Sequence, residues 1–444
     1  MSALGSFFQL EARSTTVGRE VRGGLATFMT MAYILFANPS ILGGAGIPAE
    51  SALAATALSA ALCSTLMGLV ANAPLAMAPG MGLNAVVAFQ IAAATGSWQG
   101  AMGLVVVEGL LVLALVGAGV REAVLTAIPV DLRRAIGVGI GLFIAFIGAV
   151  NARLVVVPAG TVAALAVDPS ATLPPVTAGS LRHPETLVAL AGLLLVGILL
   201  ARRQQGALVI GIVATTALAL VTGQAHWPVS GTWLSVPRLD TFGAADLSAA
   251  LHWSVVPLVL SLMMVDFFDT LGTVTAVVDE AGLSDRDGRI PGLRRLLAVD
   301  ALGAAIGGWF GASSVTTYIE SAAGVAEGAR TGLHSVVVGG LFAAAAFLAP
   351  LAGVVPAAAT APALIAVGFL MCTAITRIDF ASTDTALPAF LTILLVPLTY
   401  SIAHGIGYGF LAYVGIAVCR GRARAVHPIM YGVAVAFALF FWAE

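Results

Sequence analysis

Long apolar segments follow one another along the whole chain and leave little room for a soluble fold. They lie near 24–42, 52–71, 80–95, 99–118, 132–150, 186–201, 206–222, 254–278, 295–311, 314–328, 332–350, 357–374, 386–398, 400–418 and 427–442. Only 9% of the residues are charged and 59% are hydrophobic, too few charges to cover a soluble surface. A full membrane span needs about 20 residues, so we expect some shorter segments to be half-spans. The sequence predicts an all-α polytopic membrane protein with about 14 transmembrane segments, one of the last three apolar stretches not being a crossing.

The arginines predict how the chain is oriented, because cytoplasmic loops are enriched in basic residues. Arginines cluster before the first segment and after the fourth, sixth and eighth, at Arg13, Arg19, Arg22, Arg121, Arg133, Arg134, Arg202, Arg203, Arg286, Arg289, Arg294 and Arg295. With a cytoplasmic N-terminus (1–22), all of these fall on the cytoplasmic side. The two long loops, 151–185 and 223–253, then lie outside and contain few arginines. We expect a multi-pass protein of a bacterial inner membrane.

An internal repeat is visible between the fifth and twelfth segments. Pro129 is followed by Gly141, and Pro356 by Gly368, at the same spacing. This suggests two halves of seven segments, and an odd number of segments per half gives the halves opposite orientations, as in many secondary transporters. Pro397 with the glycines at 405, 407 and 409 matches the fifth segment equally well at a different offset, so the register of the repeat stays open.

The third and tenth segments are both predicted to begin extended and continue as helices. Pro79, Gly80 and Gly82 cannot sustain a helix, so the third segment can become helical only near Asn84, which would suit the helix cap. The tenth segment starts with Thr-, Val- and Tyr-rich extended sequence and favours helix from Glu320. Interrupted segments at corresponding positions of two halves point to a transporter binding site. The alternative is two ordinary loops between short helices.

The eighth segment carries polar residues on one helix face. Asp266, Asp269, Thr270 and Thr273 follow the spacing i, i+3, i+4 and i+7 within apolar sequence. Acids in mid-membrane are costly unless they face a cavity or each other, so we interpret them as functional. A structural role, hydrogen-bonded to a broken helix, fits Asp266 better than Asp269.

Glu320 extends this argument to the tenth segment, where it shares a helix face with Thr317, Ser321 and Gly324. Asp269 and Glu320 could together accept two N–H donors from a planar ligand. Burial disfavours the charged form of a carboxyl, so one of them could also take up and release a proton. Asp300 and Glu327 lie farther away, and we interpret them as structural or gating residues.

Other kinds of site find no support in the sequence. The histidines and the cysteines Cys63, Cys372 and Cys419 show no metal-ligand spacing, and no phosphate loop, dinucleotide motif or catalytic triad is visible. We therefore expect no metal, no cofactor and no enzymatic activity. A net charge of −2 gives no reason to expect nucleic acid as a partner.

Four sequence strings resemble the nucleobase–cation symporter family, in its hypoxanthine/guanine/adenine permease branch. They are Gly23–Pro39, Ala78–Ala85, Asp266–Thr273 and Thr316–Gly324, the last continuing to Gly332. The resemblance covers nearly the whole chain. It implies about 14 segments in two inverted repeats, a core domain (23–118 and 254–350), a gate domain (119–222 and 351–444) and an extracytoplasmic loop at 223–253. It also implies proton-driven uptake, elevator-like movement and a homodimer.

The resemblance also implies roles for single residues. A base would lie between the third, eighth and tenth segments, with its N–H donors on Asp269 and Glu320. The remaining candidates for the substrate site are Asn84, Thr270, Thr273, Ser321, Tyr318, Phe28 and Phe89, and the candidates for proton coupling are Glu320, Asp269 and Asp266. Thr273 stands where uracil and xanthine permeases often have His or Asp, which argues against those two substrates.

The alternatives to a nucleobase carrier are an anion carrier and an intramembrane enzyme. An anion carrier of the same architecture would suit two facing half-helix N-termini, but an ionised Asp269 would repel an anion. An intramembrane enzyme would need a nucleophile–base pair or a metal cluster, and the sequence shows neither.

Overall fold

A computed structural model describes residues 3–119, 128–161, 176–227, 233–252, 255–283, 290 and 292–443. The predicted loop residues Arg121, Arg286 and Arg289 lie outside this part of the chain. Within it, eight helical stretches are long and apolar enough to cross a membrane, and five further apolar helices are shorter. The prediction of a multi-pass α-helical membrane protein is confirmed at this level.

The described residues of the first half of the chain form helices and three short strands. Its elements are α1 (Ala3–Phe7), α2 (Val17–Met31), α3 (Ile34–Leu42), α4 (Ala49–Leu66), β1 (Met77–Pro79), α5 (Met81–Val86), α6 (Ala92–Thr95), α7 (Trp98–Gly117), α9 (Val130–Asn151), β2 (Val155–Val156), β3 (Thr177–Ala178), α11 (Pro184–Ala201) and α12 (Ala207–Val221). A π-helical turn, Val87–Ile91, joins α5 to α6.

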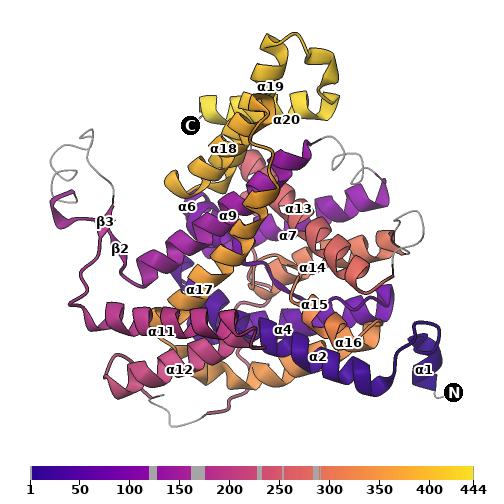
Figure 1. The fold of residues 1–444 in the computed structure, drawn as a ribbon, viewed down its shortest axis with the longest axis vertical. Helices are drawn as coiled ribbons and strands as arrows, with labels where there is room; N and C mark the ends of the chain where they lie inside the picture. Colours follow the sequence, from indigo (N-terminus) through magenta and orange to yellow (C-terminus); the bar gives the residue numbers. More distant parts are fainter. Residues whose placement is uncertain are drawn as a thin grey trace.

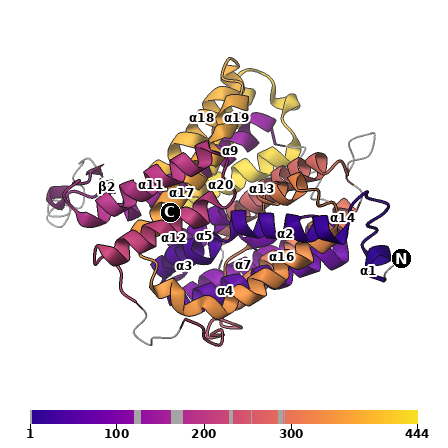
Figure 2. The ribbon, with the colours of Figure 1, turned by 60° about the horizontal axis from the view of Figure 1, so that its bottom comes forward.

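The described residues of the second half form helices and one strand. Its elements are α13 (Val256–Glu280), α14 (Leu293–Phe310), β4 (Val315–Thr317), α15 (Ser321–Ala326), α16 (Gly332–Ala345), α17 (Ala357–Cys372), α18 (Thr383–Leu398), α19 (Ile402–Cys419) and α20 (Pro428–Ala443). In Figures 1 and 2, α11 lies beside α12, α2 lies beside α16, and α18 and α19 form a hairpin that projects from the rest.

The two predicted broken segments meet in the interior. β1 leads into α5, and β4 leads through a short turn to α15, so both segments are extended first and helical afterwards, as predicted. The strands pair antiparallel, with Ala78 opposite Thr316. All six strand residues are buried. β-branched residues favour this extended form in β4, and Pro79, which has no N–H to donate, ends β1.

The start of the third-segment helix corrects the prediction for Asn84. We expected the helix to begin near Asn84, with that residue as its cap. Instead α5 begins at Met81, because Gly80 takes the capping position and its carbonyl accepts the N–H of Asn84 at 2.8 Å. Asn84 therefore lies within α5 and is not the residue that caps it.

The fifth and twelfth segments, α9 and α17, cross closely at two glycines. A Cβ atom on Gly368 would lie 2.4 Å from the carbonyl oxygen of Gly141, far inside normal contact distance. Small residues allow membrane helices to approach this closely. These are the two glycines that mark the internal repeat in the sequence.

Candidate functional site

Side-chain hydrogen bonds fasten the paired strands β1 and β4 to their surroundings. Ser64 of α4 accepts the N–H of Met77 and donates to the carbonyl of Met77, both at 2.9 Å. Ser321, the first residue of α15, accepts the N–H of Ala76 at 2.9 Å. A buried extended backbone needs such partners because water cannot reach it. The hydroxyl of Ser321, a predicted substrate ligand, therefore links the two broken segments.

Asp300 of α14 is buried and joins three elements around its carboxylate. The hydroxyl of Thr270 in α13 donates to it at 2.7 Å. From β4, the hydroxyl of Thr316 and the backbone N–H of Thr317 donate to it, each at 3.3 Å. The hydroxyl oxygens of Thr270 and Thr316, which both donate to this carboxylate, lie 3.0 Å apart. This agrees with our interpretation of Asp300 as structural and gives Thr270, a predicted substrate ligand, a structural partner.

Asp269 and Glu320 are brought together beside this network. Asp269 precedes Thr270 on α13, Glu320 is the residue before α15, and both are half-buried. Helix α13 packs against both β4 and α15, the two elements on either side of Glu320, so the packing places Asp269 near Glu320. Two carboxyls so placed in a membrane protein are costly unless they meet a polar ligand or carry a proton. The pair that the sequence singled out thus forms one acidic site.

Tyr33 belongs to this site, and our sequence reasoning missed it. It lies in the break between α2 and α3, is 1% exposed, and donates its hydroxyl to Oε1 of Glu320 at 3.0 Å. The signal that could have found it is a tyrosine hydroxyl in the middle of the apolar segment 24–42. Tyr318, which we did predict, donates its hydroxyl to the carbonyl of Pro79 at 2.5 Å.

Asn84 carries a buried amide that the protein satisfies poorly. Its Nδ2 reaches the carbonyl of Pro79 only at 3.4 Å, and its Oδ1 has no hydrogen-bond partner among the described residues. A buried acceptor without a donor costs about 1–3 kcal/mol. Asn84 is thus able to accept a hydrogen bond from a ligand. The other predicted members of the α13 face, Asp266 and Thr273, are buried on the same helix.

The three predicted aromatic candidates do not gather around one point. Phe28 packs edge-on against Phe342 of α16, with ring centroids 5.1 Å apart. Phe89 packs against Tyr400, at the tip of the α18–α19 hairpin, with centroids 5.6 Å apart. Tyr318 instead bonds through its hydroxyl to Pro79, at the end of β1.

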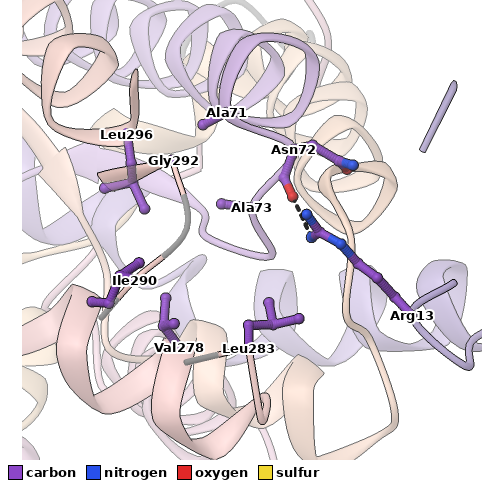
Figure 3. Close-up of a pocket in the computed structure, with 9 residues that line it drawn as sticks. All are labelled: Arg13, Ala71, Asn72, Ala73, Val278, Leu283, Ile290, Gly292 and Leu296. Carbon is purple, nitrogen blue, oxygen red and sulfur yellow. Dashed lines mark hydrogen bonds between the residues drawn. The ribbon is translucent and has the colours of Figure 1, made fainter. Parts of the chain in front are cut away.

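A separate pocket of about 250 Å³ lies near the C-terminal end of α13 and the segment after α4 (Figure 3), and neither Asp269 nor Glu320 is among the residues that line it. Its walls are mainly apolar, with Arg13 and Asn72 on one side (Figure 3). Arg13 donates to the carbonyls of Asn72 at 2.6 Å and Arg330 at 3.0 Å. Burial lowers the pKa of Arg13, and the negative charge of Glu20 opposes that shift. The guanidinium is thus committed to holding the N-terminal segment in place.

The chain is similar to known permeases over almost its full length. The model of the permease family matches residues 18–407. The adenine permease AdeP of Escherichia coli is 39% identical over 434 residues, which cover 97% of this chain and 94% of that protein. The guanine/hypoxanthine permease PbuG of Bacillus subtilis is 40% identical over 449 residues, which cover 98% of this chain and 99% of that protein.

Solved structures show the same fold at low sequence identity. The transmembrane domain of the cyanobacterial bicarbonate transporter BicA matches with a TM-score of 0.63 and 19% identity, covering 87% of this chain and 97% of that one. The murine anion transporter Solute Carrier 26 family member A9 matches with a TM-score of 0.59 and 15% identity, covering 91% and 68%. The relatives are transporters and not enzymes. The chain therefore belongs to the permease family and, among the nucleobase–cation symporters, to the branch that contains the adenine and guanine/hypoxanthine permeases.

Proposed function

We propose that this permease takes up purine nucleobases (adenine, guanine or hypoxanthine) by proton symport. The observation that carries the proposal is the half-buried pair Asp269 and Glu320 beside the antiparallel strands β1 and β4. Relatives of about 40% identity that are named for adenine or for guanine and hypoxanthine support this substrate class.

The base would lie between the third, eighth and tenth segments. Purines carry ring and exocyclic N–H donors, which the carboxylates of Asp269 and Glu320 can accept. Their ring nitrogens and carbonyls need donors, which Asn84 and backbone N–H groups can supply. Thr273 lies on the same α13 face and leaves this position without a titratable group. That supports adenine, guanine or hypoxanthine over uracil or xanthine.

Proton coupling would use the same acids. A carboxyl in a site of low polarity can exchange a proton when its surroundings change during transport. Glu320 and Asp269 are the first candidates, and Asp266, which lies one turn from Asp269 on α13, is the third. A carrier that binds base and proton at one place needs no separate relay.

We also propose that the chain moves as two domains. The core (23–118 and 254–350) would carry the base, and the gate (119–222 and 351–444) would hold still beside the 223–253 loop. Close contact between Gly141 and Gly368 supports an inverted repeat, because equivalent residues meet near a pseudo-twofold axis. A cytoplasmic N-terminus in a bacterial inner membrane and a homodimer complete the proposal.

An anion carrier is the rival function. The fold is shared with a bicarbonate transporter, but at 19% identity that likeness concerns architecture alone. Asp269 and Glu320 would place negative charge next to the anion, which is unfavourable in a site of low polarity.

Uptake into cells separates these functions. Labelled adenine, guanine, hypoxanthine, uracil and sulfate are offered to cells that lack their own purine permeases, with and without a protonophore. We expect purine accumulation that the protonophore abolishes, and strong loss of uptake in Asp269→Asn and Glu320→Gln. Sulfate uptake without purine uptake, or normal transport by both variants, contradicts the proposal.

A further inference from the structure

The first segment follows the tenth segment along its whole length. At one end, Asn38 of α3 donates to the carbonyl of Ala312, just before β4, at 3.0 Å. At the other end, Thr27 of α2 accepts the N–H of Gly324 in α15 at 3.1 Å. Tyr33 lies between these two contacts and meets Glu320. The broken tenth segment is therefore held at three points by one partner.

The contact of Tyr33 differs from the other two because it involves a side chain of the acidic pair. Asn38 and Thr27 bond to the backbone and fix only the path of the chain. Tyr33 bonds to one oxygen of a carboxyl, Oε1 of Glu320, at 3.0 Å. The tyrosine is 1% exposed, so its ring cannot turn away into solvent. Its position depends on the break at Ala32, where α2 ends and α3 has not yet begun.

We propose that Tyr33 is a positioning residue for purine binding: it holds Oε1 of Glu320 so that Oε2 is the oxygen that meets the base. This inference rests on the proposed function and assigns a role to the first segment. The hydroxyl selects one rotation of the carboxyl group and thereby fixes the direction in which the base must offer its N–H. Without it, the carboxyl can rotate, and part of the binding energy is lost in ordering it.

The hydrogen bond from Tyr33 also makes the two carboxyl oxygens of Glu320 unequal as places for a proton. The titratable groups around Glu320 are Tyr33 from the first segment, Tyr318 from the tenth and Asp269 from α13. With Tyr33 donating to Oε1, a proton taken up by Glu320 resides on Oε2, where it converts an acceptor for the base into a donor. The base therefore meets an acceptor at Oε2 while Glu320 is ionised, and a donor at the same atom once Glu320 is protonated.

Tyr33→Phe in the full-length protein tests the inference by uptake of labelled purine over a range of concentrations. Loss of one hydrogen bond to a charged group is expected to raise KM roughly tenfold while the maximal rate changes less than about threefold. Tyr431→Phe is the matched control. Tyr431 lies in the first turn of α20, and its hydroxyl donates to the carbonyl of Ala423 at 2.8 Å. Its loss should leave the KM for purine unchanged.

The cycle with Glu320→Ala, read as the purine Kd from thermal shifts in detergent, decides whether Tyr33 acts through Glu320. We expect Tyr33→Phe to raise this Kd by less than about twofold when Glu320 is already Ala, because no side-chain oxygen is left for Tyr33 to hold. A full additional tenfold effect, or a Tyr33→Phe variant as active as Tyr431→Phe, overturns the inference while wild-type purine uptake still supports the proposed function. Absence of purine uptake by the wild type overturns both.

Incorporation of 3-fluorotyrosine at position 33 covers the case in which Tyr33→Phe does not fold. The fluorinated ring keeps its hydroxyl and donates more strongly, so KM should stay within about threefold of the wild type and the hydroxyl bond should be retained. A loss of purine affinity as large as that expected for Tyr33→Phe contradicts the assignment.

Discussion

The hydroxyl of Thr270 donates a 2.7 Å hydrogen bond to the buried carboxylate of Asp300. Thr270 directly follows Asp269 on α13, and Asp300 also holds the extended strand β4 through Thr316. One carboxylate thus ties the helix that carries the first acid of the site to the segment that carries the second. Asp300 thus links the elements that carry Asp269 and Glu320.

Replacing Asp300 by Asn should weaken both the fold and transport. The carboxylate accepts three donors, whereas an amide offers one oxygen and turns an N–H₂ group toward a donor. We expect a loss of roughly 1–3 kcal/mol in stability and at least a tenfold fall in purine uptake. Thermal unfolding in detergent and uptake in cells measure the two effects.

Asp379→Asn is the control for Asp300→Asn. The exposed Asp379 accepts one backbone N–H, from Ala381, through Oδ1, and an Asn side chain can accept the same bond. We expect wild-type stability and uptake. If Asp300→Asn behaves like Asp379→Asn, the carboxylate does not organise the site.

Gly324→Ala should abolish folding or transport. A Cβ atom there would lie 2.4 Å from Nε2 of His334, 2.5 Å from Oγ1 of Thr27 and 2.6 Å from the carbonyl oxygen of Gly23. Relief requires α15 to move away from α2, which displaces Glu320 from Tyr33. Gly340→Ala is the control, because nothing lies within 4 Å of its Cβ and helical Ala is about 1 kcal/mol better than Gly. Membrane expression level and uptake compare the two variants, and equal behaviour would contradict the close packing.

Local chemistry made the central features predictable. Pro79 and Gly80 cannot continue a helix, and Thr316 and Thr317 favour extended chain, so the broken segments follow from the residues themselves. The spacing of Asp269 from its polar neighbours follows from helix geometry in the same way. Each of these inferences needs only a few consecutive residues.

Contacts between distant segments cannot be predicted from such local patterns. Tyr33 and Glu320 are separated by 287 positions, and no periodicity relates them. The sequence likewise does not show that the hydroxyl oxygen of Ser321 accepts the N–H of Ala76, 245 positions away. The start of α5 was misplaced because Gly80 was judged as a helix breaker and not as a helix cap. Tertiary packing decided all three.

Glu20 should be needed for stability and not for substrate recognition. It is fully buried, and its carboxylate accepts the hydroxyl of Thr15 and the backbone N–H groups of Arg330, Thr331 and His334 at 2.8–3.3 Å. It therefore caps the start of α16, where an anion is favoured. Glu20→Ala should cost about 2–4 kcal/mol, seen as a lower Tm in detergent.

The control for Glu20 is Glu50→Gln. Glu50 is about half exposed and pairs with Arg238 at 3.4 Å, and such a surface pair contributes less than about 1 kcal/mol. The Glu20→Ala protein that does fold should transport purine with an unchanged KM. A selective rise in KM without a fall in Tm would show that Glu20 acts at the substrate site.

Alanine substitutions of Asn84 and Asn38 should have different effects, one on purine affinity and the other on stability. Both are fully buried, but Nδ2 of Asn38 makes two good hydrogen bonds, to Thr56 at 2.9 Å and to Ala312 at 3.0 Å, whereas Nδ2 of Asn84 reaches only Pro79, at 3.4 Å. Asn38→Ala therefore breaks the protein's own contacts and should lower Tm. Asn84→Ala removes an amide that the protein barely uses, so Tm should stay within a few degrees while KM for purine rises roughly tenfold or more.

Purine-dependent thermal shifts separate the two effects in one experiment. A ligand that binds only the folded state stabilises it by RT ln(1 + [L]/Kd), so weaker binding gives a smaller shift at the same purine concentration. The shift should shrink for Asn84→Ala and persist, from a lower starting Tm, for Asn38→Ala. An undiminished shift in Asn84→Ala would remove Asn84 from the site and leave Asp269 and Glu320 to hold the base with backbone donors alone.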